Sequence, residues 1–150
     1  MAISDSHASH IRGVHVRFCL EAPSLDPAAV TDATGIAPTS LGKAGDPRTN
    51  RIGTMLGTHE QGWWQFSTKD MVDSKDINEH MRYLLAQVLP HSQVIRDLAS
   101  SGEAFFDVLW ESTCLYAGTG PVLDADVVDG MAALGAGIGF DIYQIDEDPA

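Results

Sequence analysis

Three cationic side chains lie close together in an otherwise strongly acidic sequence. Lys43, Arg48 and Arg51 belong to residues 39–61, a segment rich in Gly and Thr, whereas the whole chain has a net charge of −12. Ammonium and guanidinium groups bind carboxylate and phosphate oxygens. Glycines on either side of Lys43 would also let backbone N–H groups approach an anion. The segment therefore predicts a site for a small anionic ligand, with a solvated loop as the alternative.

Trp63 provides an aromatic surface next to that segment. Residues 63–68 alternate Trp, Phe and Thr with polar side chains, which is typical of a strand with one buried face. The alternation places Trp64 and Phe66 on the core face and leaves Trp63 on the other. Trp63 is therefore a candidate wall of the same ligand site.

A second pair of chemically capable side chains lies on an earlier predicted strand. Residues 11–21 alternate apolar and mixed positions, and His15 and Arg17 both fall on the mixed face. That face is either solvated or part of a site, and a segment roofing it would create a binding surface. The complete candidate ligand-binding set is His15, Arg17, Lys43, Arg48, Arg51 and Trp63.

Other residue patterns give little support to catalysis or metal binding. The sequence has no HxxxH or CxxC spacing, and the pair Asp124 and Asp126 is explained by the start of a helix. His59 with Glu60 is an isolated dipeptide in a loop. The strand-like surroundings of the two cysteines, residues 19 and 114, favour buried reduced thiols, although neighbouring strands would permit a disulfide. We therefore assign no catalytic residue, metal ligand or cofactor.

The composition is typical of one globular domain. A chain of 150 residues with 44% hydrophobic and 20% charged side chains is long enough for one core. Its net charge of −12 disfavours nucleic acid and anionic membranes as partners and permits a basic protein partner. The sequence shows no signal peptide and no apolar run of bilayer length, so with reduced thiols we expect a cytoplasmic location.

Strands and helices are predicted to alternate along the chain. Strands are expected at residues 11–21, 63–68, 104–113 and 138–145, and helices at 27–34, 77–89, 91–98 and 125–134. Asn78 and His80 are expected on the exposed face of the second helix. The order predicts an α+β domain with a four-stranded mixed sheet and helices packed mainly on one face, as a ferredoxin-like or related two-layer sandwich. This domain should span residues 11–145, between a disordered tail at 1–10 and an acidic tail at 146–150.

Several motifs along the chain carry a family resemblance. They are Asp26-Pro27, Val30-Thr31, Gly35-Ile36, Pro38-Thr39, Lys43 with Gly45, Gly62-Trp63-Trp64, Leu84-Leu85, Leu89-Pro90 and Ile142-Tyr143. In these motifs the chain resembles the bacterial domain-of-unknown-function family 4279, over roughly residues 11–145. The resemblance implies a cytosolic bacterial setting. None of the motifs is catalytic in character, so the resemblance implies no mechanism.

Three classes of function follow from these observations. The first is a non-catalytic protein-interaction module, immunity-like or regulatory, that uses its acidic surface against a basic partner. The alternative is a binder of small anionic metabolites that uses the 39–61 segment and Trp63. An enzyme is the least supported class. A homodimer is also expected, through the open sheet face or an edge strand, because an open sheet leaves edges to cover.

Overall fold

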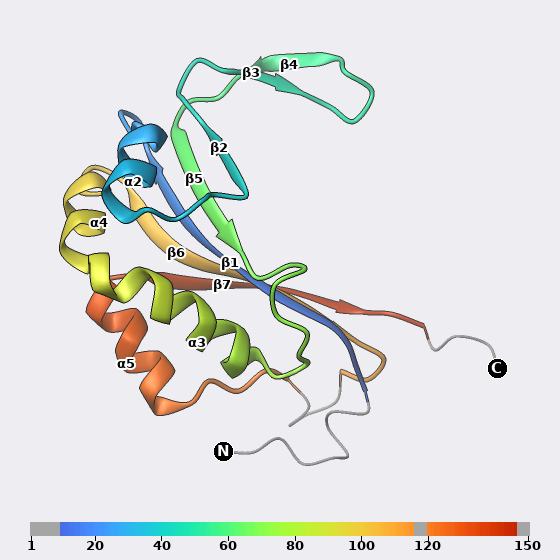
Figure 1. The fold of residues 1–150 in the computed structure, drawn as a ribbon. Coiled ribbons are helices and arrows are strands. Elements are labelled where there is room, and N and C mark those ends of the chain that lie inside the picture. The colour runs from blue at the N-terminus through green and yellow to red at the C-terminus, as the bar shows by residue number, and fades with distance from the viewer. Residues whose placement is uncertain (1–9, 116–119, 147–150) are drawn as a thin grey trace.

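A five-stranded sheet covered on one face by helices forms the body of the molecule (Figure 1). The computed structural model describes residues 10–115 and 120–146. The predicted N-terminal tail therefore lies outside the described residues except for His10, and the acidic tail except for Asp146. None of the helices in the described part of the chain is long and apolar enough to cross a membrane.

The strand order of the main sheet is β2-β5-β1-β6-β7. The body consists of β1 (Ile11–Ala22), α2 (Pro27–Thr34), β2 (Ser40–Gly42), β5 (Gly62–Ser67), α3 (Ile77–Val88), a 3₁₀ turn (Leu89–His91), α4 (Ser92–Leu98), β6 (Glu103–Ser112), α5 (Ala125–Leu134) and β7 (Gly137–Gln144). β1 pairs antiparallel with β5 on one side and β6 on the other, whereas β6 and β7 are parallel. The parallel pair requires a crossover, and α5 forms part of it. The sheet is therefore mixed, as predicted.

The number of strands differs from the prediction. Four predicted strands are present, and a fifth, β2, comes from the 39–61 segment and pairs antiparallel with β5. A strand of three residues is too short to show an alternating pattern, so periodicity could not reveal it. The ferredoxin-like order β-α-β-β-α-β is not reproduced, because α3 and α4 lie between β5 and β6 and three short strands intervene between α2 and β5.

The two faces of the main sheet differ in their cover. One face carries buried apolar side chains that pack under the helices, including Phe18 on β1, Trp64 on β5 and Phe106 on β6. The rings of Phe18 and Phe106 lie 5.2 Å apart. On the opposite face, β1 presents His15 and Arg17, and no helix packs there (Figure 1). The core face predicted for β5 is confirmed.

Helix α2 follows the local signals of its sequence. The Asp26 side chain accepts a hydrogen bond from the Ala28 N–H, and Pro27 occupies the first turn. Gly35 ends the helix in the left-handed conformation, with φ of 69°. Helix α3 ends at Val88, one residue before the predicted boundary, and Pro90 lies in the 3₁₀ turn that follows.

His80 is buried in α3, and the prediction that it points outward is wrong. Its Nε2–H donates to the Ser74 carbonyl at 2.7 Å, because a carbonyl can only accept, and its Nδ1 shares a hydrogen bond of 2.7 Å with the Thr68 hydroxyl. The same hydroxyl oxygen accepts the Val16 N–H at 3.0 Å. The imidazole therefore joins the β5–α3 connection to the sheet.

Asn78 is also buried, contrary to the prediction. Its Nδ2 donates to the Val122 carbonyl at 2.9 Å, and its Oδ1 accepts the Asp124 N–H at 2.8 Å. One turn further along α3, Arg82 donates to the carboxylates of Asp124 and Asp126. The beginning of α5 thus covers the polar face of α3, which helical periodicity within α3 alone cannot reveal.

The remaining part of the 39–61 segment forms a projecting arm rather than a loop. We define the arm as residues 43–61. Within it, β3 (Pro47–Thr49) and β4 (Met55–Thr58) pair antiparallel in a separate two-stranded sheet. Every residue of both strands is exposed. Figure 1 shows the arm extending from the end of the main sheet, away from α3 and α5.

The two cysteines differ in burial. Cys19 is buried, as predicted, whereas Cys114 is only partly buried, and no disulfide links them. Cys19 belongs to β1 in the middle of the sheet, and Cys114 follows the end of β6. Their strands are neighbours, but the two residues occupy opposite ends of the β1–β6 ladder, because Cys19 pairs with Phe105 there.

Candidate functional site

The six candidate residues do not converge on one site. His15 and Arg17 line a depression on the helix-free face of the sheet, which we call the sheet hollow; its volume is about 370 Å³. Arg48 and Trp63 line a second depression at the base of the arm, the arm groove, of about 430 Å³. Lys43 and Arg51 line neither of them.

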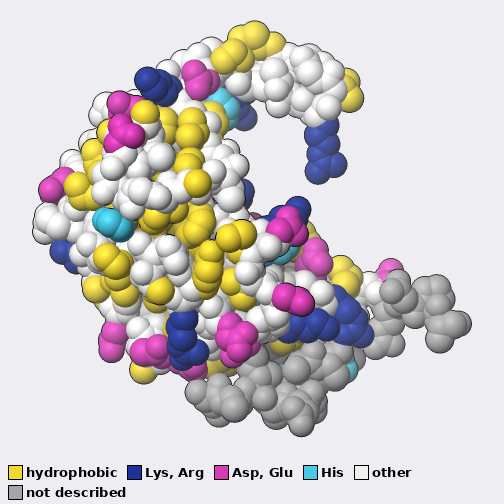
Figure 2. Space-filling view, in the orientation of Figure 1, with side chains coloured by type: hydrophobic (Ala, Val, Ile, Leu, Met, Phe, Trp, Pro, Cys, Tyr) yellow, Lys and Arg dark blue, Asp and Glu magenta, His cyan; other side chains and the backbone are white. Residues whose placement is uncertain are grey.

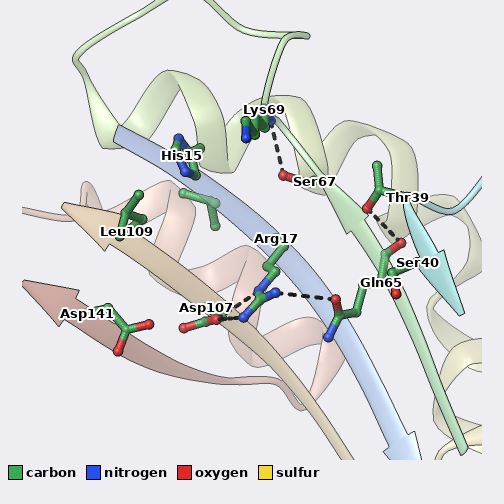
Figure 3. A pocket seen from close by; sticks show the side chains of 11 residues that line it. His15, Arg17, Thr39, Ser40, Gln65, Ser67, Lys69, Asp107, Leu109 and Asp141 are labelled. Atoms are coloured by element: carbon green, nitrogen blue, oxygen red, sulfur yellow. Dashed lines mark hydrogen bonds and ion pairs between the residues drawn. The ribbon is translucent and has the colours of Figure 1, made fainter. Parts of the chain in front are cut away.

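An ion pair occupies the centre of the sheet hollow. Arg17 on β1 and Asp107 on β6 are directly opposite each other in the sheet, which brings their side chains together. Arg17 Nε and one terminal nitrogen donate to the same carboxylate oxygen at 2.8 and 2.6 Å. The other terminal nitrogen donates to Gln65 Oε1 at 3.4 Å, so Arg17 lies between Asp107 and Gln65 (Figure 3).

This pairing determines the electrostatics of Arg17. Burial opposes its charged form, but the hydrogen bonds and the charge of Asp107 outweigh burial and raise the pKa of the guanidinium. Both side chains remain partly exposed, at 48% for Arg17 and 20% for Asp107. Arg17 is therefore a charged and oriented hydrogen-bond donor whose charge is balanced by Asp107.

A histidine and a lysine form the other end of the sheet hollow. Partial burial and the nearby charge of Lys69 lower the pKa of His15, so the imidazole favours its neutral form. The Lys69 backbone N–H donates to the Ser67 hydroxyl at 3.1 Å, and Asp141 on β7 lines the opposite side. The hollow thus contains cationic, neutral and acidic groups in one polar surface.

Cys19 lies on the same face of the sheet but is not a reactive thiol. Burial raises its pKa to about 12, and the charge of Asp107 acts in the same direction. With this pKa the thiol stays protonated near neutral pH, and it is unreactive because the thiolate is the reactive form of cysteine. Cys19 therefore acts as a small apolar side chain between Gln65 and Phe105, its partners in the two neighbouring strands.

Trp63 anchors the arm to the sheet. Its ring lies against Gly42, where an added Cβ would approach the ring to 2.0 Å, and its Nε1–H donates to the Ser40 hydroxyl at 3.0 Å. On the arm side, the centroids of His59 and Trp63 are 4.1 Å apart. The predicted aromatic wall is thus packed between β2 and the arm, and only part of it faces the groove.

The arm groove is not a cationic pocket. Arg48 contributes a guanidinium, but Glu21 and Glu60 line the same depression. Lys43 lies outside it, 4.0 Å from an Asp26 carboxylate oxygen. The cations predicted to bind one anion are consequently separated from each other, and carboxylates accompany those that line a depression.

Backbone hydrogen bonds close the base of the arm. Gly45 N–H donates to the His59 carbonyl at 2.8 Å, and the His59 N–H donates to the Asp46 carbonyl at 2.9 Å. The Asp46 carboxylate also accepts the Lys43 N–H at 2.8 Å. Gly45 has a φ of 91°, in the left-handed region that other residues avoid. The arm therefore has a defined base.

The tip of the arm combines an ordered turn with exposed apolar side chains. Asn50 Oδ1 accepts the N–H groups of Ile52 and Thr54. Ile52, Met55 and Leu56 are 85%, 60% and 58% exposed. We call these three residues the arm tip. They were absent from the predicted site, and the signal that could have found them is three large apolar residues within a segment of Gly, Thr and polar residues.

No metal site is evident in the described part of the chain. Among residues 10–115 and 120–146, no three His, Cys, Asp or Glu side chains lie close enough together to hold a metal ion. The side chains that line the two depressions can form ion pairs, hydrogen bonds and apolar contacts.

Fold and site together define a class of small domain: a two-layer α+β body with a projecting β-hairpin arm. The chain belongs to the family described as "Domain of unknown function (DUF4279)", which matches residues 12–145. The resemblance seen in the sequence motifs is thereby confirmed. No curated protein and no solved structure matches the chain.

Proposed function

We propose that the protein is a non-catalytic protein-interaction module whose arm binds an apolar and acidic surface on a protein partner. The observation that carries the proposal is the exposure of the arm tip, where Ile52, Met55 and Leu56 project from a hairpin outside the main sheet. Figure 2 shows hydrophobic side chains on the arm and an open space between the arm and the body. Immunity-like and regulatory roles both belong to this class.

The energetics of a hairpin support a binding role for the arm. A two-stranded hairpin is marginally stable in water on its own, and exposed apolar side chains do not stabilise it. Each Å² of apolar surface removed from water contributes roughly 25 cal/mol, so a partner that covers the arm tip gains affinity there. The closed base of the arm limits the ordering that binding requires, which further favours association.

The charge of the arm supports an acidic partner surface. Residues 47–58 of the arm include two arginines, Arg48 and Arg51, and no acidic residue. Over the whole arm the three cations still outnumber the two carboxylates, Asp46 and Glu60, whereas the whole chain has a net charge of −12. A basic partner was expected from the net charge alone. We keep a basic partner surface as the expectation for the acidic body. For the arm we expect an acidic partner surface, because complementary potentials favour association.

The test compares two triple variants of the full chain. Arm-tip variant Ile52→Ser/Met55→Ser/Leu56→Ser removes the proposed contact. Control variant Met71→Ser/Val122→Ser/Val128→Ser removes three apolar side chains of similar exposure from the body. Each chain is used as bait in an extract of the producing cells, and a protein lost only with the arm-tip variant is purified and titrated calorimetrically.

We expect that protein to bind wild type and control with equal affinity and the arm-tip variant at least about tenfold more weakly, which corresponds to about 1.4 kcal/mol. Equal affinity of all three chains would contradict the proposal. An extract in which no captured protein depends on the arm tip would contradict the proposal as well.

A small anion is the second candidate ligand, and the sheet hollow is the observation that favours it. His15, Arg17 and Lys69 line this hollow together, although Asp107 and Asp141 line it as well. If the hollow binds anions, inorganic phosphate and citrate should raise the melting temperature of the wild-type chain saturably. His15→Gln and Lys69→Gln should each weaken that effect, and Lys43→Gln, outside the hollow, should leave it unchanged.

A further inference from the structure

Strand β7 presents an unprotected edge. It is the last strand of the main sheet, and within the described residues no strand pairs with its outer side. Seven of its eight residues are exposed. Its ladder with β6 runs without a bulge from Gly137 to Gln144, and the strand contains neither Pro nor Lys, the residues that commonly block edge pairing. Apart from the single charge of Asp141, the strand therefore lacks the devices that keep an edge strand solitary.

The edge also exposes large apolar side chains. Phe140 and Ile142 are opposite the buried Val108 and Trp110 of β6, so they belong to the apolar face of the sheet, yet they are 41% and 46% exposed. Figure 1 shows the C-terminal end of β7 extending beyond α5, and the exposure of these two side chains means that the helices cover them only in part. Apolar cover has to come from outside the described body if these side chains are to be buried.

The sequence of β7 is complementary to itself in the antiparallel direction. With a two-fold axis at Phe140, Ile138 is opposite Ile142 of a second copy, and the two Phe140 rings meet on the axis. Gly139 is then opposite Asp141, and Gly137 is opposite Tyr143, so each large residue of the other face meets a glycine. Cross-strand apolar pairs stabilise such a sheet, and an aromatic side chain packs well over an opposing glycine.

Registers shifted toward the C-terminus lose this complementarity. A shift by one residue toward the C-terminus places Phe140 opposite Asp141 and breaks the apolar row, because it reverses the faces of one strand. A shift by two places the two Asp141 carboxylates opposite each other, which is unfavourable. Asp141 is the only charged residue in the strand, so few like charges meet at this edge although the whole chain has a net charge of −12.

We propose that β7 is a dimerisation strand that pairs antiparallel with β7 of a second copy of this chain, across a two-fold axis at Phe140. The two main sheets then form one continuous sheet of ten strands, and Phe140 and Ile142 gain apolar cross-strand neighbours. An isologous contact of this kind closes on itself, so it gives a dimer rather than a fibre. The proposal does not involve the arm and is independent of the function proposed for it.

The test measures the association of the full chain by sedimentation velocity over a wide concentration range. We expect a reversible dimer for wild type and for the arm-tip variant. Phe140→Lys and Phe140→Glu each place like charges on the axis, so each should raise the dimer dissociation constant at least about tenfold. Mixing the two variants should restore dimers, because Lys at position 140 of one copy then meets Glu at position 140 of the other.

Circular dichroism and thermal melting of each variant establish that the folded monomer persists, which the exposure of Phe140 predicts. A wild-type chain that stays monomeric throughout would overturn the proposal. So would a dimer that both single variants leave intact, or variants that dissociate but fail to form mixed dimers. A dimer that only the arm-tip variant dissociates would move the self-association to the arm.

Discussion

Two regions of this molecule reverse the usual distribution of polar and apolar side chains, and they do so in opposite ways. At the beginning of α3, the polar side chains Asn78 and His80 are buried. At the arm tip, apolar side chains are exposed instead. The buried polar groups have hydrogen-bond partners inside the protein, so their burial is explained by the fold itself. The exposed apolar groups have no such explanation within the body.

The difference separates structural from functional departures from the simple rule of apolar inside and polar outside. A buried polar group that is fully hydrogen-bonded specifies how neighbouring elements meet, and its removal should affect folding. A cluster of exposed apolar side chains on an ordered hairpin contributes little to folding, and its removal should affect association. Substitutions in the two regions should separate the two kinds of effect.

Replacing His80 should produce the largest loss of stability. His80→Ala removes a buried ring and leaves the Thr68 hydroxyl and the Ser74 carbonyl without their present partner. We expect the free energy of unfolding to fall by about 3 kcal/mol, from the cavity and the unpaired groups together. Urea unfolding measures this change. Glu79→Ala, an exposed neighbour on the same helix, is the control and should change stability by less than about 0.5 kcal/mol.

Replacing Asn78 should have the next largest effect. Asn78→Ala removes the acceptor of the Asp124 N–H and the donor to the Val122 carbonyl, both in the segment that leads into α5. The expected loss is about 2 kcal/mol, because each group must find water or remain unpaired. Hydrogen exchange should also show faster opening of α5 than of β1. Uniform loss of protection over both elements would contradict a local role for Asn78.

How far the sequence predicts the fold depends on how local each signal is. The N-cap at Asp26 and the stop at Gly35 predicted α2 correctly, because capping is decided within a few residues. The alternation around Trp64 likewise predicted the buried face of β5. The short strands within the 39–61 segment were missed, since three or four residues pair only when another strand is present to receive them.

The candidate site was predicted less completely than the fold. The sequence indicated that His15 and Arg17 share the mixed face of β1, and both line the sheet hollow. It could not indicate that Arg17 is paired with Asp107, because that contact depends on the register of two strands ninety residues apart. Nor could it separate Arg48 from Lys43 and Arg51, because their spacing in the chain does not reveal the direction of the arm.

The arm base should respond to changes as a packed structure, unlike the arm tip. Gly42→Ala would place a Cβ 2.0 Å from the Trp63 ring, so the ring or β2 must move. We expect a loss of about 1 kcal/mol in the free energy of unfolding, as for overpacking elsewhere. Tryptophan fluorescence should shift toward that of an exposed indole. An unchanged spectrum with unchanged stability would show that Trp63 does not anchor the arm.

Acidification should weaken the fold slightly through His15. Burial and Lys69 lower the pKa of His15 in the folded chain below its ordinary value of 6.5, so the unfolded chain binds the proton more tightly. The contribution of His15 to the free energy of unfolding is therefore fully present above about pH 6.5, and it is lost as the pH falls through the lowered pKa of the folded state. His15→Gln should reduce the pH dependence of the urea midpoint in this range. An identical pH profile for both chains would show that His15 does not contribute to the pH dependence of stability.

The arm-tip variant should have the smallest effect on stability of all the changes considered. Ile52, Met55 and Leu56 are already in contact with water, so replacing them with serine removes little buried surface. We expect the three substitutions together to change the free energy of unfolding by less than about 0.5 kcal/mol, within the range of ordinary surface changes.

Thermal melting of the isolated chain measures the effect of the arm-tip variant, with the body control Met71→Ser/Val122→Ser/Val128→Ser alongside. A loss of several kcal/mol confined to the arm-tip variant would mean that these side chains pack against the body in solution. The contrast with α3 would then disappear, because both reversals would be parts of one folded core. Unchanged stability would leave association as the property that the exposed arm tip affects.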